Sequence, residues 1–113
     1  MKEKILKFIR ENEHVTYVEL ERLFERNNYD YKGDFQSSSD SNPNVIFWTG
    51  WSTEAFGLIH ELVEEKKIER CVTDMLTYLT DGKCLRLPIV KKDIEKYTYK
   101  NLHWLPIVFN PVY

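Results

Sequence analysis

Residues 44–53 read NVIFWTGWST and set an aromatic, β-branched run against a glycine and an apparent helix start. The content of residues 44–49 is typical of a strand. Ser52 is a favourable N-cap, so a helix is predicted to begin directly after it. Trp48 and Trp51 stand on either side of the glycine. The function of the chain depends on whether these two tryptophans are core residues or surfaces on which a ligand stacks.

The predicted strand places neighbouring side chains on opposite faces. Phe47 lies in register with Val45 and is expected inside, while Trp48 shares the other face with Ile46. Trp51 precedes the N-cap, where an apolar residue often packs against the next helical turn. Burial is the ordinary fate of large aromatic side chains. Contact with a ligand is the sharper alternative, and Trp51 is the better candidate for it.

Local signals predict two helices before this stretch and one after it. Residues 2–12 carry apolar side chains on one side and charged ones on the other. Thr16 and Glu19 fit a capping box that opens a helix running to about Arg26. Residues 27–43 are rich in Asn, Ser, Asp and Gly and are predicted to be a loop. The helix after Ser52 is expected to extend to about residue 65.

Three short runs with strand composition follow the third predicted helix: residues 68–72, 76–79 and 83–87. Asp81-Gly82 is a strong hairpin signal because both residues tolerate a positive φ. Pro88 ends this predicted meander. A basic stretch with two tyrosines and an apolar, aromatic tail complete the chain.

This order of elements resembles a winged helix-turn-helix domain. HVTYVELERLF (residues 14–24) is similar to the first helix-turn-helix step, and ELVEEKKIER (residues 61–70) to the passage from the third helix into the wing. The resemblance covers roughly residues 2–88, and it departs from the pattern at the long loop, since a tight helix-turn-helix joins its helices by about 3–4 residues. We therefore expect an α+β winged-helix domain of three helices and a hairpin wing over residues 1–88, with residues 89–113 as a basic, aromatic extension packed on the same domain.

The charges of the chain bear on the partner it takes. Residues 1–65 hold seven Lys/Arg and thirteen Asp/Glu (7 − 13 = −6), whereas residues 66–113 hold nine and five (9 − 5 = +4). Four glutamates and no Lys or Arg lie in residues 52–65. In proteins that read duplex DNA through a helix-turn-helix, this helix meets phosphates, so an acidic one is unsuited to that task. A polyanion is expected to meet the second half.

Binding of single strands needs cations along the backbone and aromatic faces for the bases. The aromatic stretch and the basic second half supply both residue types. The predicted nucleic-acid-binding residues are Trp48, Trp51, Lys67, Arg70, Lys83, Arg86, Lys91, Lys92, Lys96, Tyr97, Tyr99, Lys100 and Trp104. Lys66, Tyr29 and Tyr31 are further candidates. Packing is at least as good an explanation for Trp104, and a solvated face is the default explanation for a run of lysines.

A second resemblance rests on NVIFWTGWS, LTYLTDGK and HWLPIVFN. Together these segments are similar to small proteins of staphylococcal cassette chromosome elements and related phage islands, among them a winged-helix single-stranded-DNA-binding protein. The resemblance implies a replication accessory of a mobile genetic element that works beside a helicase or primase-polymerase. It carries no motif that assigns individual DNA contacts.

Other classes of function have little support in the sequence. The three histidines (His14, His60 and His103) share no metal-ligand spacing, and no phosphate-binding loop or nucleophile elbow is present. No apolar run approaches the roughly 20 residues of a membrane helix. Two cysteines suggest no disulfide framework. We expect a cytoplasmic, non-catalytic protein without cofactor or metal; the alternatives are a protein-interaction module that docks through the acidic third helix and the tail, and a duplex-binding regulator.

Overall fold

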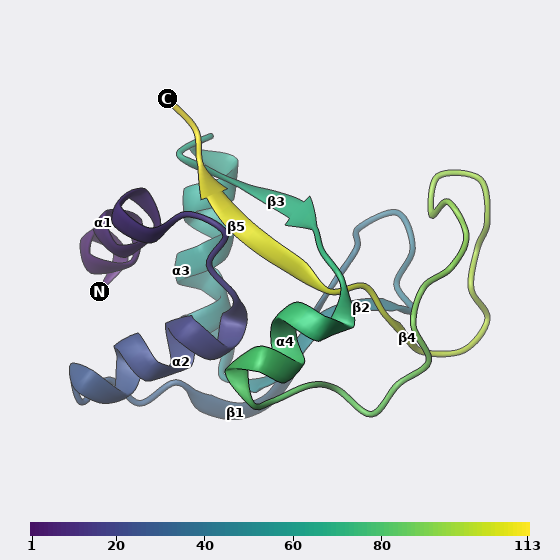
Figure 1. Ribbon diagram of the computed structural model, residues 1–113, viewed down its shortest axis with the longest axis horizontal. Coiled ribbons are helices and arrows are strands. Elements are labelled where there is room, and N and C mark those ends of the chain that lie inside the picture. Colours follow the sequence, from purple (N-terminus) through teal and green to yellow (C-terminus); the bar gives the residue numbers. More distant parts are fainter.

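Four helices and two small sheets make up residues 1–113 of the computed structural model, an α+β arrangement (Figure 1). The helices are α1 (Lys2–Asn12), α2 (Tyr17–Arg26), α3 (Thr53–Glu64) and α4 (Met75–Asp81). The strands are β1 (Lys32–Ser38), β2 (Val45–Trp51), β3 (Ile68–Val72), β4 (His103–Trp104) and β5 (Ile107–Pro111). The α+β class is confirmed, while the fourth helix was not predicted.

The helices α2 and α3 begin where their capping residues predict. The backbone N–H of Glu19 donates to the Thr16 hydroxyl over 3.1 Å, and the Glu19 carboxylate accepts from the Thr16 backbone N–H over 3.2 Å. The Ser52 hydroxyl accepts from the backbone N–H of Ala55 over 3.1 Å. Both N-terminal caps are confirmed, because they satisfy helix donors that otherwise have no partner within the helix.

Strand β2 is the centre of the first sheet, whose order is β1-β2-β4. It pairs antiparallel with β1 and parallel with the short β4, where Val45 lies opposite His103. All four residues from Val45 to Trp48 are buried, so both faces of the strand are covered. The strand prediction is confirmed, and Phe47 is buried as expected. The predicted loop over residues 27–43 is wrong in part, because β1 occupies residues 32–38 and forms an irregular, largely exposed ladder with β2.

The second sheet pairs β3 with β5 over five residues, from Ile68 opposite Pro111 to Val72 opposite Ile107. Val15, between α1 and α2, forms a further bridge to Phe109 of β5. The strand at residues 68–72 is thus confirmed. Its predicted hairpin partner is wrong, because the C-terminal tail supplies the neighbouring strand.

The predicted strand at residues 76–79 is wrong because this run lies in α4. The Asp74 side chain accepts from the Thr77 backbone N–H over 3.0 Å and so caps the helix, and Gly82 ends it with a φ of 90°. A glycine in this conformation is a common helix terminator, so Asp81-Gly82 is no hairpin turn. Residues 83–87 are not a strand either.

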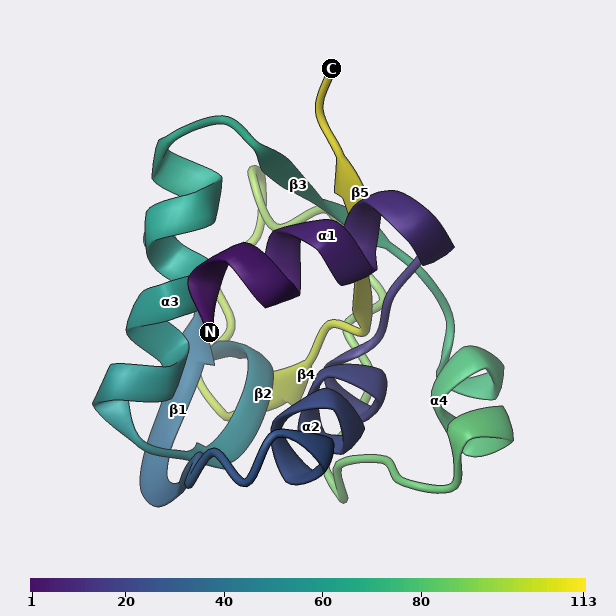
Figure 2. The same cartoon turned by 90° about the vertical axis from the view of Figure 1, so that its left-hand side faces the viewer.

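The core lies between the helices and the two sheets. In Figure 2, α1 lies across α3 and β5, with α2 below it and α4 to one side. Tyr78 attaches α4 to the core, since its buried hydroxyl donates to the carbonyl oxygen of Ile107 over 2.6 Å. None of the helices combines the length and the apolar character that crossing a bilayer requires.

Candidate nucleic-acid interface

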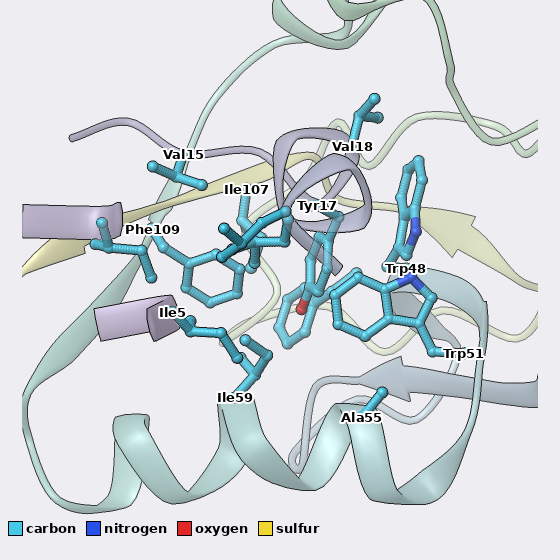
Figure 3. Packing of buried hydrophobic residues seen from close by; sticks show 14 of the residues in the cluster. Ile5, Val15, Tyr17, Val18, Trp48, Trp51, Ala55, Ile59, Ile107 and Phe109 are labelled. Carbon is cyan, nitrogen blue, oxygen red and sulfur yellow. The ribbon is translucent and has the colours of Figure 1, made fainter. Parts of the chain in front are cut away.

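The three tryptophans are core residues, each with 0% of its surface exposed. Trp48 stacks on Tyr17 with 5.7 Å between ring centroids (Figure 3). Trp51 stacks on Phe56 with 4.9 Å between ring centroids. Trp104 is also enclosed, and its indole N–H donates to a backbone carbonyl over 3.1 Å. The prediction that these residues offer faces to DNA bases is therefore corrected, because no face of any of the three rings reaches the surface.

A buried carboxylate explains why two tryptophans so close in sequence turn inward together. One oxygen of Glu21 accepts from the indole N–H of Trp48 over 2.9 Å and from that of Trp51 over 2.8 Å. Figure 3 shows the two indole nitrogens turned toward the same side. The other oxygen accepts from the ammonium group of Lys83 over 2.8 Å. A charged acceptor inside the domain thus has three donors, which buried polar groups need. Sequence analysis overlooked Glu21.

The Tyr99 side chain holds the surrounding segment in place and is not available for a base to stack on. Its side chain is buried, and its hydroxyl accepts from the backbone N–H groups of Lys91 and Lys92 over 3.0 Å each. The ring packs against His103 with 4.1 Å between centroids. Tyr99 therefore shapes the segment around it, which corrects its predicted role as a stacking surface.

The two loop tyrosines also serve packing. Tyr31 is buried, stacks on Phe24, and donates its hydroxyl to Glu25 over 2.8 Å. Tyr29 packs on the same Phe24 ring with 5.1 Å between centroids. Burial is the main reason that the pKa of each phenol is raised. These residues hold the start of β1 against α2.

Tyr97 alone among the predicted platforms exposes much of its ring, at 42%. The Lys92 ammonium lies 4.2 Å from its ring centroid, and Tyr99 meets it edge-on at 4.9 Å. The Tyr97 carbonyl oxygen accepts from the side chain of Asn42 over 2.8 Å. The ring is therefore both accessible and fixed at its backbone.

Three of the nine predicted cations are engaged within the protein. The Lys67 ammonium lies 3.5 Å from Glu65, and Lys83 is bonded to Glu21. The guanidinium of Arg70 lies 5.1 Å from the ring centroid of Phe47.

Apart from Lys66, which lies between α3 and β3, the remaining predicted cations lie on one long connection, residues 83–102, which we name the basic loop. It holds six Lys/Arg and two Asp/Glu (6 − 2 = +4). Its exposed cations without a carboxylate within 4.0 Å are Arg86, Lys91, Lys92, Lys96 and Lys100. Figure 1 shows much of this segment extending from the body on the side away from α1.

Side-chain bonds hold the basic loop against the β1–β2 connection. Asn42 binds it twice, as donor to the Tyr97 carbonyl and as acceptor from the Tyr99 backbone N–H over 3.3 Å. Asn44 donates to the Tyr99 carbonyl over 2.9 Å. The Asp93 carbonyl closes a turn by accepting from two following N–H groups. The loop is thus an exposed, positively charged segment with a defined course.

Comparisons with known protein families, with curated proteins and with solved structures found no match for this chain.

Proposed function

We propose that the protein is a non-catalytic single-stranded-DNA-binding protein that acts through the basic loop, as a replication accessory of a mobile genetic element. The observation that carries this proposal is the group of five exposed cations without a carboxylate partner on the same loop as the exposed Tyr97. Cations along the backbone and aromatic faces for bases are the two needs of single-strand binding. The replication role and its partner, a helicase or primase-polymerase, rest on the sequence resemblance alone.

A winged-helix fold is part of this proposal. In its favour, α1, α2 and α3 precede an antiparallel β3–β5 ribbon, and Val15 joins that ribbon from between α1 and α2. In place of a short wing turn, residues 73–106 connect the two strands. The basic loop belongs to this connection, so the proposed contact surface is an elaborated wing.

The negative charge of α3 supports a preference for single-stranded DNA over duplex DNA. Its glutamates face solvent, and no Lys or Arg lies on the helix to contact phosphates. A helix that enters the major groove would place these carboxylates near two phosphate backbones, which repel them.

Fluorescence anisotropy with labelled single-stranded and duplex oligonucleotides of equal length tests the proposal. We expect tighter binding of single strands, weak sequence preference, and an affinity that falls steeply with salt because cation–phosphate contacts release counterions. Replacing Lys91, Lys92, Lys96 and Lys100 by alanine should remove most binding and flatten the salt dependence. Equal or tighter binding of one specific duplex would refute the preference, and no binding by the intact protein would refute the function.

The contribution of Tyr97 has a matched control. Tyr97→Ala should weaken single-strand binding by about tenfold to a hundredfold, the effect of losing one stacked base. Tyr113→Ala removes a tyrosine that is even more exposed, at the C-terminus and away from the basic loop, and should leave affinity unchanged. Equal effects of the two substitutions would exclude a stacking role for Tyr97.

A protein-docking role is the second candidate, and one observation favours it. Met75, Leu76 and Leu79 are exposed at spacings that place them along one side of α4, and the exposed Val72 precedes them at the end of β3. This surface differs from the acidic α3 and tail that the sequence suggested. Docking through it should be insensitive to salt, unlike DNA binding. Leu76→Glu should abolish binding of the proposed replication partner and leave DNA affinity intact; loss of DNA affinity instead would contradict the separation of the two surfaces.

A further inference from the structure

A polar groove of about 480 Å³ lies between α3, the β1–β2 hairpin and β3, apart from the basic loop. Thirteen residues line it, and three of them are hydrophobic. Serine hydroxyls from β1 and the following turn form one wall, and Gly57 leaves α3 without a side chain on the other. The serine hydroxyls and the Arg70 guanidinium in its lining are hydrogen-bonding groups that a small polar ligand can use.

Arg70 is the only Lys or Arg among the lining residues. It is half-buried, no carboxylate oxygen lies within 4.0 Å of its guanidinium, and its Nε is buried without a hydrogen-bond partner. The Phe47 ring supports the guanidinium plane from below. A partly desolvated charge without a counterion is costly, so the absence of a carboxylate partner points to an anion from outside.

A second polar group without a partner lies at the same place. The hydroxyl of Tyr17 and Nε of Arg70 are the two buried side-chain polar atoms that lack a hydrogen bond. Tyr17 is fully buried and packs edge-on against Phe109, which is paired with Arg70 across the β3–β5 ladder. Burial raises the pKa of Tyr17, and the nearby Arg70 and Ser37 side chains oppose that rise. The Tyr17 hydroxyl therefore lies beside Arg70 behind the groove, and like the Arg70 Nε it is not itself exposed to a ligand in the groove.

We propose that this groove binds the oxyanion group of a small ligand, a carboxylate or a phosphate monoester, against Arg70. The planar guanidinium matches either group with two parallel hydrogen bonds. The hydroxyls of Ser37 and neighbouring serines supply further donors. This site is independent of the basic loop and goes beyond the proposed function.

Two acidic residues in the lining of the groove limit the charge that the rest of the ligand can carry. Asp40 and Glu64 also line it, and Glu64 lies 3.7 Å from His60. Two carboxylates at the rim repel a chain of phosphates, so a nucleic-acid backbone is excluded from this position. The ligand is instead a single oxyanion whose remaining part is neutral or positively charged.

Nuclear magnetic resonance titration of the full chain with acetate, and separately with inorganic phosphate, tests the site. We expect saturable shifts of the Arg70 side-chain Nε–H resonance and of the Ser37 and Gly57 amides. Tighter binding of acetate would assign a carboxylate ligand, and tighter binding of phosphate a phosphate monoester. Shifts that stay linear with concentration for both probes would overturn the proposal.

Matched variants separate the groove from general anion effects. Arg70→Met should abolish the saturable shifts. Arg26→Met removes another guanidinium stacked on a phenylalanine ring, at 5.7 Å from Phe8, and should leave them unchanged. Arg70→Lys keeps the charge but lacks the planar guanidinium, so it should weaken anion binding at least severalfold. This variant keeps the test usable if Arg70→Met does not fold. Glu64→Gln should tighten phosphate binding, since it removes repulsion at the rim. Saturable shifts that survive in both Arg70 variants would assign the anion to another place.

Discussion

The buried carboxylate of Glu21 provides the sharpest test of how this domain is held together. Trp48 and Trp51 both donate to it, and Lys83 reaches it from the start of the basic loop. Glu21→Met keeps the length of the side chain and removes the acceptor. Glu21→Gln keeps one oxygen that can still accept from both indoles. The comparison of these two variants separates the acceptor from the charge.

The expected losses follow from the bonds that each variant breaks. Glu21→Met leaves two buried indole N–H groups without a partner, at about 1–3 kcal/mol each, while removing a carboxylate that was itself desolvated. We expect a net loss of about 2–4 kcal/mol in the free energy of unfolding. Glu21→Gln loses the ion pair with Lys83, whose side chain is 54% exposed, so that pair contributes about 0–1 kcal/mol. Weaker indole bonds bring the expected loss for Glu21→Gln to about 1 kcal/mol.

Urea denaturation followed by far-ultraviolet circular dichroism measures both losses without relying on tryptophan emission, which the substitutions alter directly. The control is Glu11→Met, because Glu11 is exposed on α1 and its ion pair with Lys7 spans 3.8 Å. Surface changes of this kind stay within about 0.5 kcal/mol. If Glu21→Met were no more destabilising than Glu11→Met, the two indoles would not depend on the carboxylate and the explanation for their burial would be refuted.

Three other substitutions test packing and titration by the same denaturation assay. Gly33→Ala should destabilise the protein by about 1–3 kcal/mol, because a Cβ there would lie 2.7 Å from backbone atoms of Ser52. Gly57→Ala places its methyl group in open space on α3 and should stabilise the protein by about 0.5–1 kcal/mol. Equal effects of the two substitutions would contradict the clash at Gly33. Tyr17→Phe should raise stability by about 1 kcal/mol by removing an unpartnered hydroxyl, and a loss of that size would show that the hydroxyl has a partner. Burial raises the pKa of the Tyr78 phenol, so as the pH rises the unfolded chain loses the phenol proton before the folded protein does. The stability that Tyr78 contributes should therefore be complete below about pH 10, the ordinary phenol pKa, and should fall above it. Tyr78→Phe should make this fall in the free energy of unfolding shallower.

Elements with local signals were predicted well from the sequence. The Thr16–Glu19 capping box and the Ser52 cap fix the starts of α2 and α3, because each cap needs only residues within one turn. The apolar faces of α1 and α2 have the helical period that neighbouring residues alone determine. Residues 44–49 and 68–72 carry enough β-branched and aromatic side chains to identify strands.

Elements that depend on distant partners were missed. β1 is polar and largely exposed, so its sequence lacks the alternation of a half-buried strand, and it forms because β2 is beside it. The β3–β5 pairing joins segments more than thirty residues apart, which no local pattern reveals. The signal for α4 was present in Asp74 and Gly82, but the turn propensity of Asp81-Gly82 was given more weight than its helix-ending role.

The candidate site likewise has a part that the sequence predicts and a part that depends on tertiary contacts. Lysines are almost always exposed, so composition alone placed the cations of the basic loop on the surface. The tryptophans could not be assigned, because their burial depends on Glu21, a charged residue that sequence patterns place on the outside of a helix. Glu21 is buried because two indoles donate to its carboxylate. This is a tertiary contact between α2 and β2, and only their spatial arrangement reveals it.

The polar contacts that enclose the core also set the form of the basic loop. Lys83 ties its first residue to Glu21, and Asn42 holds its later part through Tyr97 and Tyr99. A segment already held in place loses less conformational entropy when it binds than a free tail of the same charge does. For the proposed function, this arrangement favours fast, salt-sensitive binding through phosphates with one stacked base. Because a phenol ring stacks on any base and lysines read only charge, the same arrangement offers little means of telling one sequence from another.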